Sequence, residues 1–196
     1  MLSKEICLNG YIEVVCGPMF AGKTEELIRR ANRLSIAKVD FLVFKPRLDD
    51  RYSKLPEIVS HNKLAYKCIM IDKSEDILTY IKPNIKAVII DEAQFLDNEI
   101  VNICDALANK GLRVIVGGLD CDFRGVPFGP MPYLLAIAEY VTKLQAVCVK
   151  TGLPATKSQR LIDGSPAKYD DELVLIGSTE SYEPRSRVAY EHPRKK

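Results

Sequence analysis

Residues 17–24 read Gly-Pro-Met-Phe-Ala-Gly-Lys-Thr and match the phosphate-binding loop pattern G-x-x-x-x-G-K-[ST]. The apolar run Tyr11–Cys16 before the loop predicts a strand, and Thr24–Ser35 after it has the apolar spacing of an amphipathic helix. In this order the three parts bind phosphate, because backbone N–H groups and the helix N-terminus surround the phosphate oxygens. The sequence therefore predicts a nucleotide site in which Lys23 contacts the β- and γ-phosphates and Thr24 binds Mg²⁺.

A second apolar run, residues 88–90, ends in two acids, Asp91 and Glu92. In a phosphate-binding-loop fold an acid at this point binds Mg²⁺ directly or through water, so Asp91 is the expected magnesium partner of Thr24. Glu92 is then a candidate general base, which takes a proton from water in an ATPase or from a substrate hydroxyl in a kinase. The motif alone leaves both reactions open.

Short apolar runs alternate with helical patterns over the first three quarters of the chain. Further strands are predicted at Asp40–Lys45, Cys68–Ile71, Ala87–Asp91 and Arg113–Gly117. Further helices are predicted from a Ser74 cap to Ile81 and from an Asp97 cap to Gly111. This alternation predicts an α/β fold with a mostly parallel sheet and helices on both faces.

The composition changes near residue 147. Residues 148–192 contain many glycines and prolines and one clear apolar strand, Leu173–Ile176. We therefore expect an α/β domain over residues 1–147 and a small loop-rich domain with a hairpin over residues 148–192. Residues 193–196 are expected to be a disordered tail.

The overall composition narrows the partners that this chain is expected to have. Of its 196 residues 47% are apolar and 28% are charged, which is ordinary for a globular protein. The formal net charge of +2 gives no electrostatic case for a nucleic-acid partner. No apolar run approaches the roughly 18 residues of a membrane span, and the first residues lack a signal-peptide core, so we expect a cytoplasmic protein. None of the six cysteines forms a C-x-x-C pair.

Longer segments carry a resemblance to one enzyme family. They are GPMFAGKTEELIRR (17–30), FKPRLDDRY (44–52), VIIDEAQFL (88–96), GGLDCDFRGVPFGPMPYLLAIAEYVTKLQAVC (117–148), ATKSQR (155–160) and LIGSTESY (175–182). With these segments in this order, the chain resembles the cytosolic-type thymidine kinases of bacteria and animals. The phosphate-binding loop is shared with many families, whereas residues 119–130 and 155–160 are far more specific.

The resemblance implies transfer of the γ-phosphate of ATP to the 5′-hydroxyl of thymidine or deoxyuridine in nucleoside salvage, with Glu92 as general base. It also implies Mg²⁺ bound with ATP, a homotetramer, feedback inhibition by dTTP, and a small "lasso" domain that closes over the nucleoside. The expected ATP contacts are Gly17, Pro18, Met19, Phe20, Ala21, Gly22, Lys23, Thr24, Asp91 and Gln94. The expected nucleoside contacts are Met19, Arg51, Phe95, Leu119, Phe123, Phe128, Ser158, Leu173, Leu175 and Tyr182.

Two arginines and four aromatic residues suit such a site. Arg51 and Arg160 are candidates to neutralise phosphate charge, although both also fit an ordinary surface role. The aromatic residues can cover the flat apolar face of a base. They are Phe95, Phe123, Phe128 and Tyr182.

The sequence departs from the resembled family at the zinc site that ties its lasso domain. Cys148 occupies the first ligand position, but Thr151, Ser186 and Ala189 stand at the other three. A structural zinc needs four ligands, and even with His192 this chain offers two. We therefore expect no structural zinc.

Two other functions remain open at this point. An ATP-hydrolysing motor would share the phosphate-binding loop and the acidic pair, but it needs nucleic-acid contacts that a near-neutral chain does not predict. A non-catalytic regulatory subunit would explain the lost zinc ligands, but not the retention of Lys23, Thr24, Asp91 and Glu92.

Overall fold

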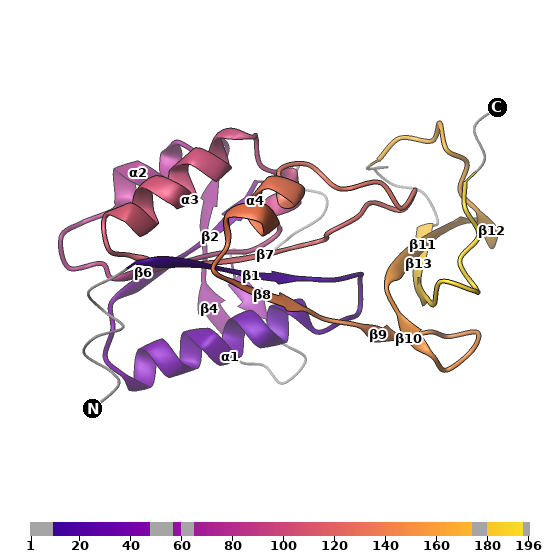
Figure 1. Cartoon of the computed structure of the whole chain (residues 1–196), viewed down its shortest axis with the longest axis horizontal. Helices are drawn as coiled ribbons and strands as arrows, with labels where there is room; N and C mark the ends of the chain where they lie inside the picture. The colour runs from indigo at the N-terminus through magenta and orange to yellow at the C-terminus, as the bar shows by residue number, and fades with distance from the viewer. Residues whose placement is uncertain (1–9, 48–56, 60–64, 174–179, 194–196) are drawn as a thin grey trace.

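A six-stranded, fully parallel sheet in the order β5-β2-β6-β7-β1-β8 forms the centre of the molecule (Figure 1). The computed structural model that shows it describes residues 10–47, 57–59, 65–173 and 180–193. The strands are β1 (Tyr11–Cys16), β2 (Phe41–Pro46), β5 (Ile69–Ile71), β6 (Ala87–Ile90), β7 (Arg113–Gly118) and β8 (Tyr140–Lys143). Every residue of β6 is buried, as expected for a parallel strand covered on both faces.

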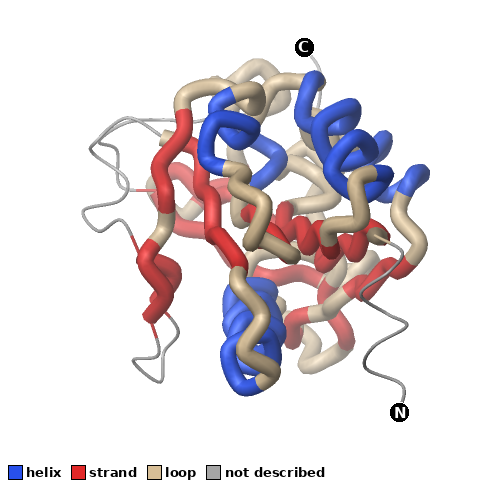
Figure 2. Tube along the Cα trace, turned by 90° about the vertical axis from the view of Figure 1, so that its left-hand side faces the viewer, coloured by secondary structure: helices blue, strands red, loops and turns tan. Residues whose placement is uncertain are grey.

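Helices cover both faces of this sheet (Figure 2). On one face lies α1 (Lys23–Ile36), and on the other lie α2 (Asp76–Tyr80), α3 (Glu99–Asn109) and α4 (Met131–Ile137), with the short 3-10 helix η1 (Ala93–Phe95) after β6. Neighbouring residues of each strand point to opposite faces, so one strand contributes to both apolar cores. Val15 and Ile89 pack with α1, whereas Val14 and Val88 pack with α3. The predicted α/β fold is thereby confirmed.

The predicted elements of the sheet match the structure to within a few residues, with one correction. Strand β1 and helices α1 and α3 lie where the pattern placed them. The N-cap residue of α3 is Asn98, which makes no side-chain cap; the predicted cap residue, Asp97, lies one position earlier, and its carboxylate accepts the Glu99 N–H at 3.0 Å. The predicted Ser74 cap is wrong, because α2 has no side-chain cap and starts two residues later. The Asp76 carboxylate accepts the N–H groups of Asp72 and Lys73 instead, at 3.1 and 3.0 Å.

The remaining strands form three small antiparallel sheets. One is the hairpin of β3 (Glu57–Val59) and β4 (Ala65–Lys67). The other two follow β8 and lie together on the right of Figure 1. They contain β9 (Ala146–Val147), β10 (Pro154–Ala155), β11 (Lys157–Ile162), β12 (Ser165–Pro166) and β13 (Glu180–Arg185). Of the predicted strand Leu173–Ile176, only Leu173 is described, and it lies in a bend; residues 194–196 of the predicted tail lie outside the described residues.

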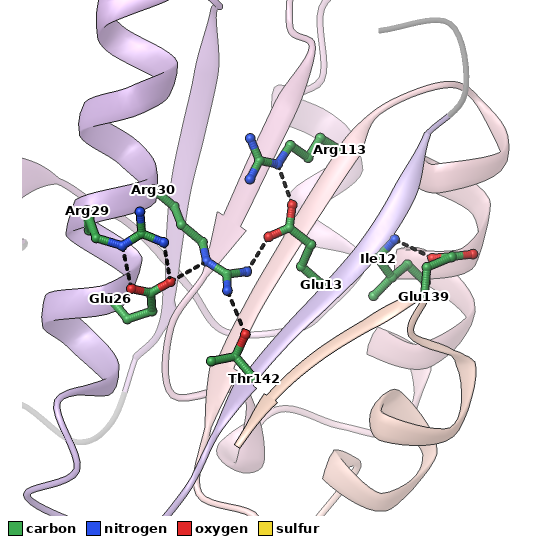
Figure 3. A network of polar contacts seen from close by, with 8 residues as sticks. All are labelled: Ile12, Glu13, Glu26, Arg29, Arg30, Arg113, Glu139 and Thr142. Atoms are coloured by element: carbon green, nitrogen blue, oxygen red, sulfur yellow. Dashed lines mark hydrogen bonds and ion pairs between the residues drawn. The ribbon is translucent and has the colours of Figure 1, made fainter. Parts of the chain in front are cut away.

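A buried ion-pair network fixes α1 to the sheet (Figure 3). Glu13 of β1 is 6% exposed and pairs with Arg30 of α1 and, at 2.6 Å, with Arg113 of β7. Arg30 also donates to Thr142 of β8 at 2.9 Å and pairs with Glu26 of its own helix at 2.9 Å. A buried charge is tolerated only when paired and hydrogen-bonded, so this network locks α1 against three neighbouring strands.

Among the described helices, none has the length and apolar character needed to cross a membrane.

Candidate active site

Three loops meet at the carboxyl edge of the sheet because the strands before them are parallel and lie side by side in the order β6-β7-β1. Strand β1 ends at Cys16 and leads into the loop 17–22, β6 leads into Asp91 and Glu92, and β7 leads into Leu119 and Asp120. Ligands of open α/β sheets bind at this edge. The topology therefore brings the two sequence motifs, separated by about 70 residues, to one place.

The phosphate-binding loop is folded around its own lysine. Gly22 adopts a left-handed conformation at the start of α1, and its carbonyl accepts the Glu26 N–H at 3.0 Å. Lys23 is 9% exposed, and its Nζ donates to the Pro18 carbonyl oxygen at 2.8 Å. Phe20, at the tip of the loop, is 64% exposed. The loop thus presents a nearly buried ammonium group below an open tip.

Acidic groups surround this lysine. Burial lowers the pKa of Lys23, and the charges of Glu92, Asp91 and Asp120 oppose this effect in that order. Asp120 is itself 7% exposed and pairs with Lys143 of β8 at 2.8 Å. The site therefore holds cationic and anionic groups close together in a poorly hydrated setting, where electrostatic interactions are stronger than in water.

The two acids after β6 differ in exposure. Asp91 is 3% exposed, and burial, followed by the charge of Glu92, raises the pKa of its carboxyl group. Glu92 is half-buried and has a left-handed backbone with φ 55°. This conformation is uncommon for a residue with a Cβ and is typical of functional sites. The Asp91 Oδ1 accepts the Glu92 N–H at 2.9 Å, which fixes the turn between them.

Gln94 of η1 connects the acidic pair to the end of β7. Its Nε2 donates to Glu92 Oε2 at 2.5 Å, and its Oε1 accepts the Leu119 N–H at 3.0 Å. The side chain is 3% exposed. We predicted Gln94 as an ATP contact, and the structure places its amide between Glu92 and Leu119.

The predicted nucleoside contacts form two groups in the structure. The rings of Phe95 and Phe128 meet edge to face, with centroids 5.4 Å apart. In the other group the Ser158 hydroxyl of β11 accepts the N–H of Met19 in the phosphate-binding loop at 2.9 Å. Residues 128 and 158 thus bring two distant segments against the loops of the sheet edge.

Phe123 is less open than the sequence suggested. The residue is 4% exposed, and its ring centroid lies 5.2 Å from the guanidinium carbon of Arg124 and 5.0 Å from that of Arg160. The Tyr190 hydroxyl donates to the Phe123 carbonyl oxygen at 2.5 Å. Arg160, a candidate phosphate partner, is fully buried on β11 and donates to the Glu172 carbonyl oxygen. The structure therefore places both residues in the contact between the loop after β7 and the small sheets.

Sequence reasoning missed Arg124 and Tyr190, which complete this contact. Arg124 also donates to the Asp171 carbonyl oxygen at 2.9 Å and lies 5.1 Å from the Tyr169 ring centroid. Neither residue stands in an apolar period or in a recognisable pattern with its partners.

Four further residues were predicted to contact the nucleoside, and the structure describes two of them. Tyr182 of β13 is half-buried and pairs in register with Arg160, and Leu173 is exposed. Arg51 and Leu175 lie outside the described residues.

Residues 10–190 match the family model described as thymidine kinase. The thymidine kinase of Aster yellows witches'-broom phytoplasma (strain AYWB) is 58% identical over 179 residues, which cover 91% of this chain and 86% of that protein.

Two solved structures show a weak similarity to this chain. They are the genome packaging NTPase B204 of Sulfolobus turreted icosahedral virus 2 in complex with ATP-gammaS and with sulfate. Their TM-scores are 0.41 and 0.40, with 17% and 19% identity. They cover 68% and 69% of this chain and, in each case, 74% of the other.

Proposed function

The chain belongs to the thymidine kinase family, and from this premise we propose that it transfers the γ-phosphoryl group of ATP to the 5′-hydroxyl of thymidine or deoxyuridine. The observation that carries the proposal is the meeting of Lys23, Asp91 and Glu92 at one sheet edge, in a chain that matches the family over residues 10–190. Phosphoryl transfer needs cationic groups on the phosphates and a base on the attacking hydroxyl. These three residues supply both.

Glu92 is the general base in this proposal. It accepts the proton of the 5′-hydroxyl while that oxygen bonds to the γ-phosphorus and the bond from the γ-phosphorus to the bridging oxygen breaks. ADP leaves with the electron pair of that bond, and the products are dTMP and ADP. The half-buried position of Glu92, next to the phosphate-binding loop, supports this role because a base must reach the hydroxyl proton of a substrate that lies beside the γ-phosphate.

Thr24 and Asp91 would hold Mg²⁺ together with the ATP phosphates. Both offer hard oxygen ligands, which Mg²⁺ prefers. When bound, Mg²⁺ supplies neutralisation of phosphate charge.

Residues 17–24 hold the phosphates in this proposal, and Lys23 moves from the Pro18 carbonyl to the β- and γ-phosphates. In the structure the ammonium group is satisfied by its 2.8 Å hydrogen bond to the Pro18 carbonyl oxygen. The exchange costs little because a charged phosphate oxygen is a stronger acceptor than a carbonyl.

On the nucleoside side, we assign the base to the surface around Phe95 and Phe128, with Met19 and Leu119 beside it. The edge-to-face pair fixes both rings, so a base can contact them with little loss of side-chain entropy. Phe123, Ser158, Leu173, Leu175, Arg51 and Tyr182 remain proposed contacts of the nucleoside or its closing lasso.

We also propose that the lasso domain over residues 148–192 lacks a structural zinc. The hydroxyls of Thr151 and Ser186 are 3.1 Å apart, within hydrogen-bond distance of each other. Cys148 is 1% exposed; burial raises the pKa of its thiol, but hydrogen bonds from Thr151, Ser186 and the Lys150 backbone outweigh this and lower it to about 6. Cys148, Thr151 and Ser186 stand at three of the four positions where the resembled family has zinc ligands, and here they are hydrogen-bonded to one another. Ala189 stands at the fourth position.

Further properties are proposed from the resemblance: a homotetramer, inhibition by dTTP, a cytoplasmic location and a role in salvage. The near-neutral charge supports the absence of a nucleic-acid partner.

The test is phosphate transfer from Mg²⁺–ATP to thymidine, deoxyuridine, deoxycytidine and deoxyadenosine. We expect product with thymidine and deoxyuridine only. ATP hydrolysis that responds to nucleic acid and not to thymidine would instead indicate a motor, and ATP binding without any nucleoside product would indicate a regulatory subunit.

A further inference from the structure

The side-chain amide of Gln94 is fixed by hydrogen bonds at both ends. The amide has one partner on each side, Glu92 and Leu119, and the residue is 3% exposed. The backbone around it is also fixed, because in η1 the Glu92 carbonyl oxygen accepts the Phe95 N–H at 3.1 Å. A side chain used in this way has little freedom to turn towards a nucleotide.

Two glycines make room for Gln94. A Cβ on Gly118 would lie 2.8 Å from Gln94 Oε1 and 2.6 Å from the Met131 sulfur. A Cβ on Gly129, whose φ is +49°, would lie 2.4 Å from the Gln94 backbone oxygen. Such separations are far inside ordinary contact distance, so both positions are limited to glycine as long as Gln94 stays in place.

The hydrogen bonds also fix which end of the amide faces the acid. A backbone N–H can only donate, so the atom that meets the Leu119 N–H must be the amide oxygen. The NH₂ group therefore faces Glu92, where it donates to Oε2. This leaves the other carboxylate oxygen of Glu92, Oε1, to meet a substrate hydroxyl.

We propose that Gln94 is a positioning residue for the general base: it holds Glu92 Oε2 through its NH₂ group, so that Oε1 is presented to the 5′-hydroxyl. This inference rests on the proposed role of Glu92. It also gives the left-handed backbone of Glu92 a purpose, since the turn directs that side chain back towards the amide two residues later. Through Leu119, the same amide ties the base to the loop that carries the proposed nucleoside contacts.

The principal variant is Gln94→Met, which keeps the length of the side chain and removes both hydrogen bonds. Hydrogen bonds to charged groups carry enough free energy that we expect kcat to fall about ten- to a hundredfold. The KM for ATP should change by less than about twofold, because the variant acts on the chemical step. A raised KM for ATP with an unchanged kcat would overturn the proposal and make Gln94 an ATP contact.

The matched control is Gln159→Met on β11. Gln159 is fully buried, donates to the Glu191 carbonyl oxygen at 3.2 Å and accepts the Glu191 N–H at 2.8 Å. Its side chain points away from the face that carries its neighbours Ser158 and Arg160, because side chains alternate along a strand. Both variants should lower the unfolding midpoint, but Gln159→Met should leave kcat unchanged. An equal loss of kcat in the two variants would mean that Gln94 is only structural.

A double-mutant cycle with Glu92→Gln separates this inference from the proposed function. If Gln94 acts through Glu92, adding Gln94→Met to Glu92→Gln should lower kcat by less than about twofold. A full additional loss would overturn the positioning role while leaving Glu92 as the base. A wild-type kcat in Glu92→Gln alone would instead remove the base itself, and the inference with it.

Gln94→Glu provides a second test should Gln94→Met not fold. At pH 9, where both carboxyl groups are ionised, its carboxylate can still accept the Leu119 N–H but has no proton to donate to Glu92. The proposal predicts the same loss of kcat as for Gln94→Met, and a wild-type kcat in Gln94→Glu would overturn it.

Discussion

Replacing Asp91 with asparagine should stabilise the ligand-free protein although it removes a proposed magnesium ligand. Asp91 is almost fully buried, and burial together with the charge of Glu92 raises the pKa of its carboxyl group from 3.8 to about 7. The folded protein thus holds an anion that would be more stable in the unfolded chain. Asparagine keeps the oxygen that accepts the Glu92 N–H and carries no charge.

The size and pH dependence of this effect follow from the ionisation equilibria. A pKa raised from 3.8 to about 7 corresponds to at most about 4 kcal/mol of destabilisation when the group is ionised. This shift already includes the favourable charges of Lys45 and Lys23. Relaxation of the protein and water entry around a buried anion reduce its cost, so we expect a net gain of about 2 kcal/mol for Asp91→Asn above pH 7. The folded state binds the extra proton between the two pKa values. The gain is therefore absent below about pH 4 and grows as the pH rises to 7.

Thermal unfolding in EDTA, at pH 8 and at pH 4, tests this reasoning. For a chain of this length, about 2 kcal/mol corresponds to a midpoint raised by about 4–8 °C at pH 8, with no difference at pH 4. Adding Mg²⁺–ATP should stabilise the wild type and leave Asp91→Asn much less affected, since ligands stabilise the state that binds them. A lower midpoint for the variant at pH 8 would refute the account of Asp91 as an uncompensated buried anion.

Three further predictions concern the nucleoside side and the small domain. Phe128→Ala removes the ring that meets Phe95, and steady-state kinetics should show a KM for thymidine raised about tenfold with the KM for ATP unchanged. Ser158→Ala leaves the Met19 N–H without its acceptor, and the KM for ATP should rise several-fold, whereas an unchanged value would mean that this bond does not shape the loop. Metal analysis of the purified protein should find no stoichiometric zinc with Cys148, and about one zinc per chain would contradict the proposed zinc-free lasso domain.

Five of the six sheet strands and helices α1 and α3 could be predicted from the sequence because their signals are local, whereas β8 and α4 were not predicted. A strand covered on both faces, such as β6, is a continuous apolar run, and α1 carries its apolar face at helical spacing. The position of the nucleotide loop and the acidic pair at one edge then follows from parallel topology alone. The short α2 differs because its start is fixed by the Asp76 carboxylate and not by the serine that the pattern favoured.

The small sheets could not be predicted in the same way. Strand β11 buries Ser158, Gln159 and Arg160, three polar residues that no apolar pattern identifies. Their burial depends on partners far along the chain, among them Met19 and Glu191. Such burial is favourable only once every polar group has its partner, which is a property of the assembled fold.

The parts of the site that sequence reasoning missed also depend on contacts that exist only in the assembled fold. The pairing of Gln94 with Glu92 requires a left-handed residue at position 92, and glutamate gives no local signal for this conformation. Phe123 lies close to two arginines: Arg124 is its neighbour in the chain, whereas Arg160 lies far along the chain. Neither arrangement has a period or a spacing that could be recognised beforehand.

The enclosure of Phe123 also matters while the chain is still being made. Residues 119–129 leave the ribosome before the residues that cover them, and Tyr190 follows Phe123 by 67 positions. At about 5–20 residues per second, the Phe123 ring waits about 3–13 seconds for its last partner. During this interval the parallel sheet can already form through β7, but the side proposed to bind the nucleoside stays uncovered. Nascent chains that end before β13 should therefore be the species that a chaperone recognising exposed aromatic residues binds most strongly.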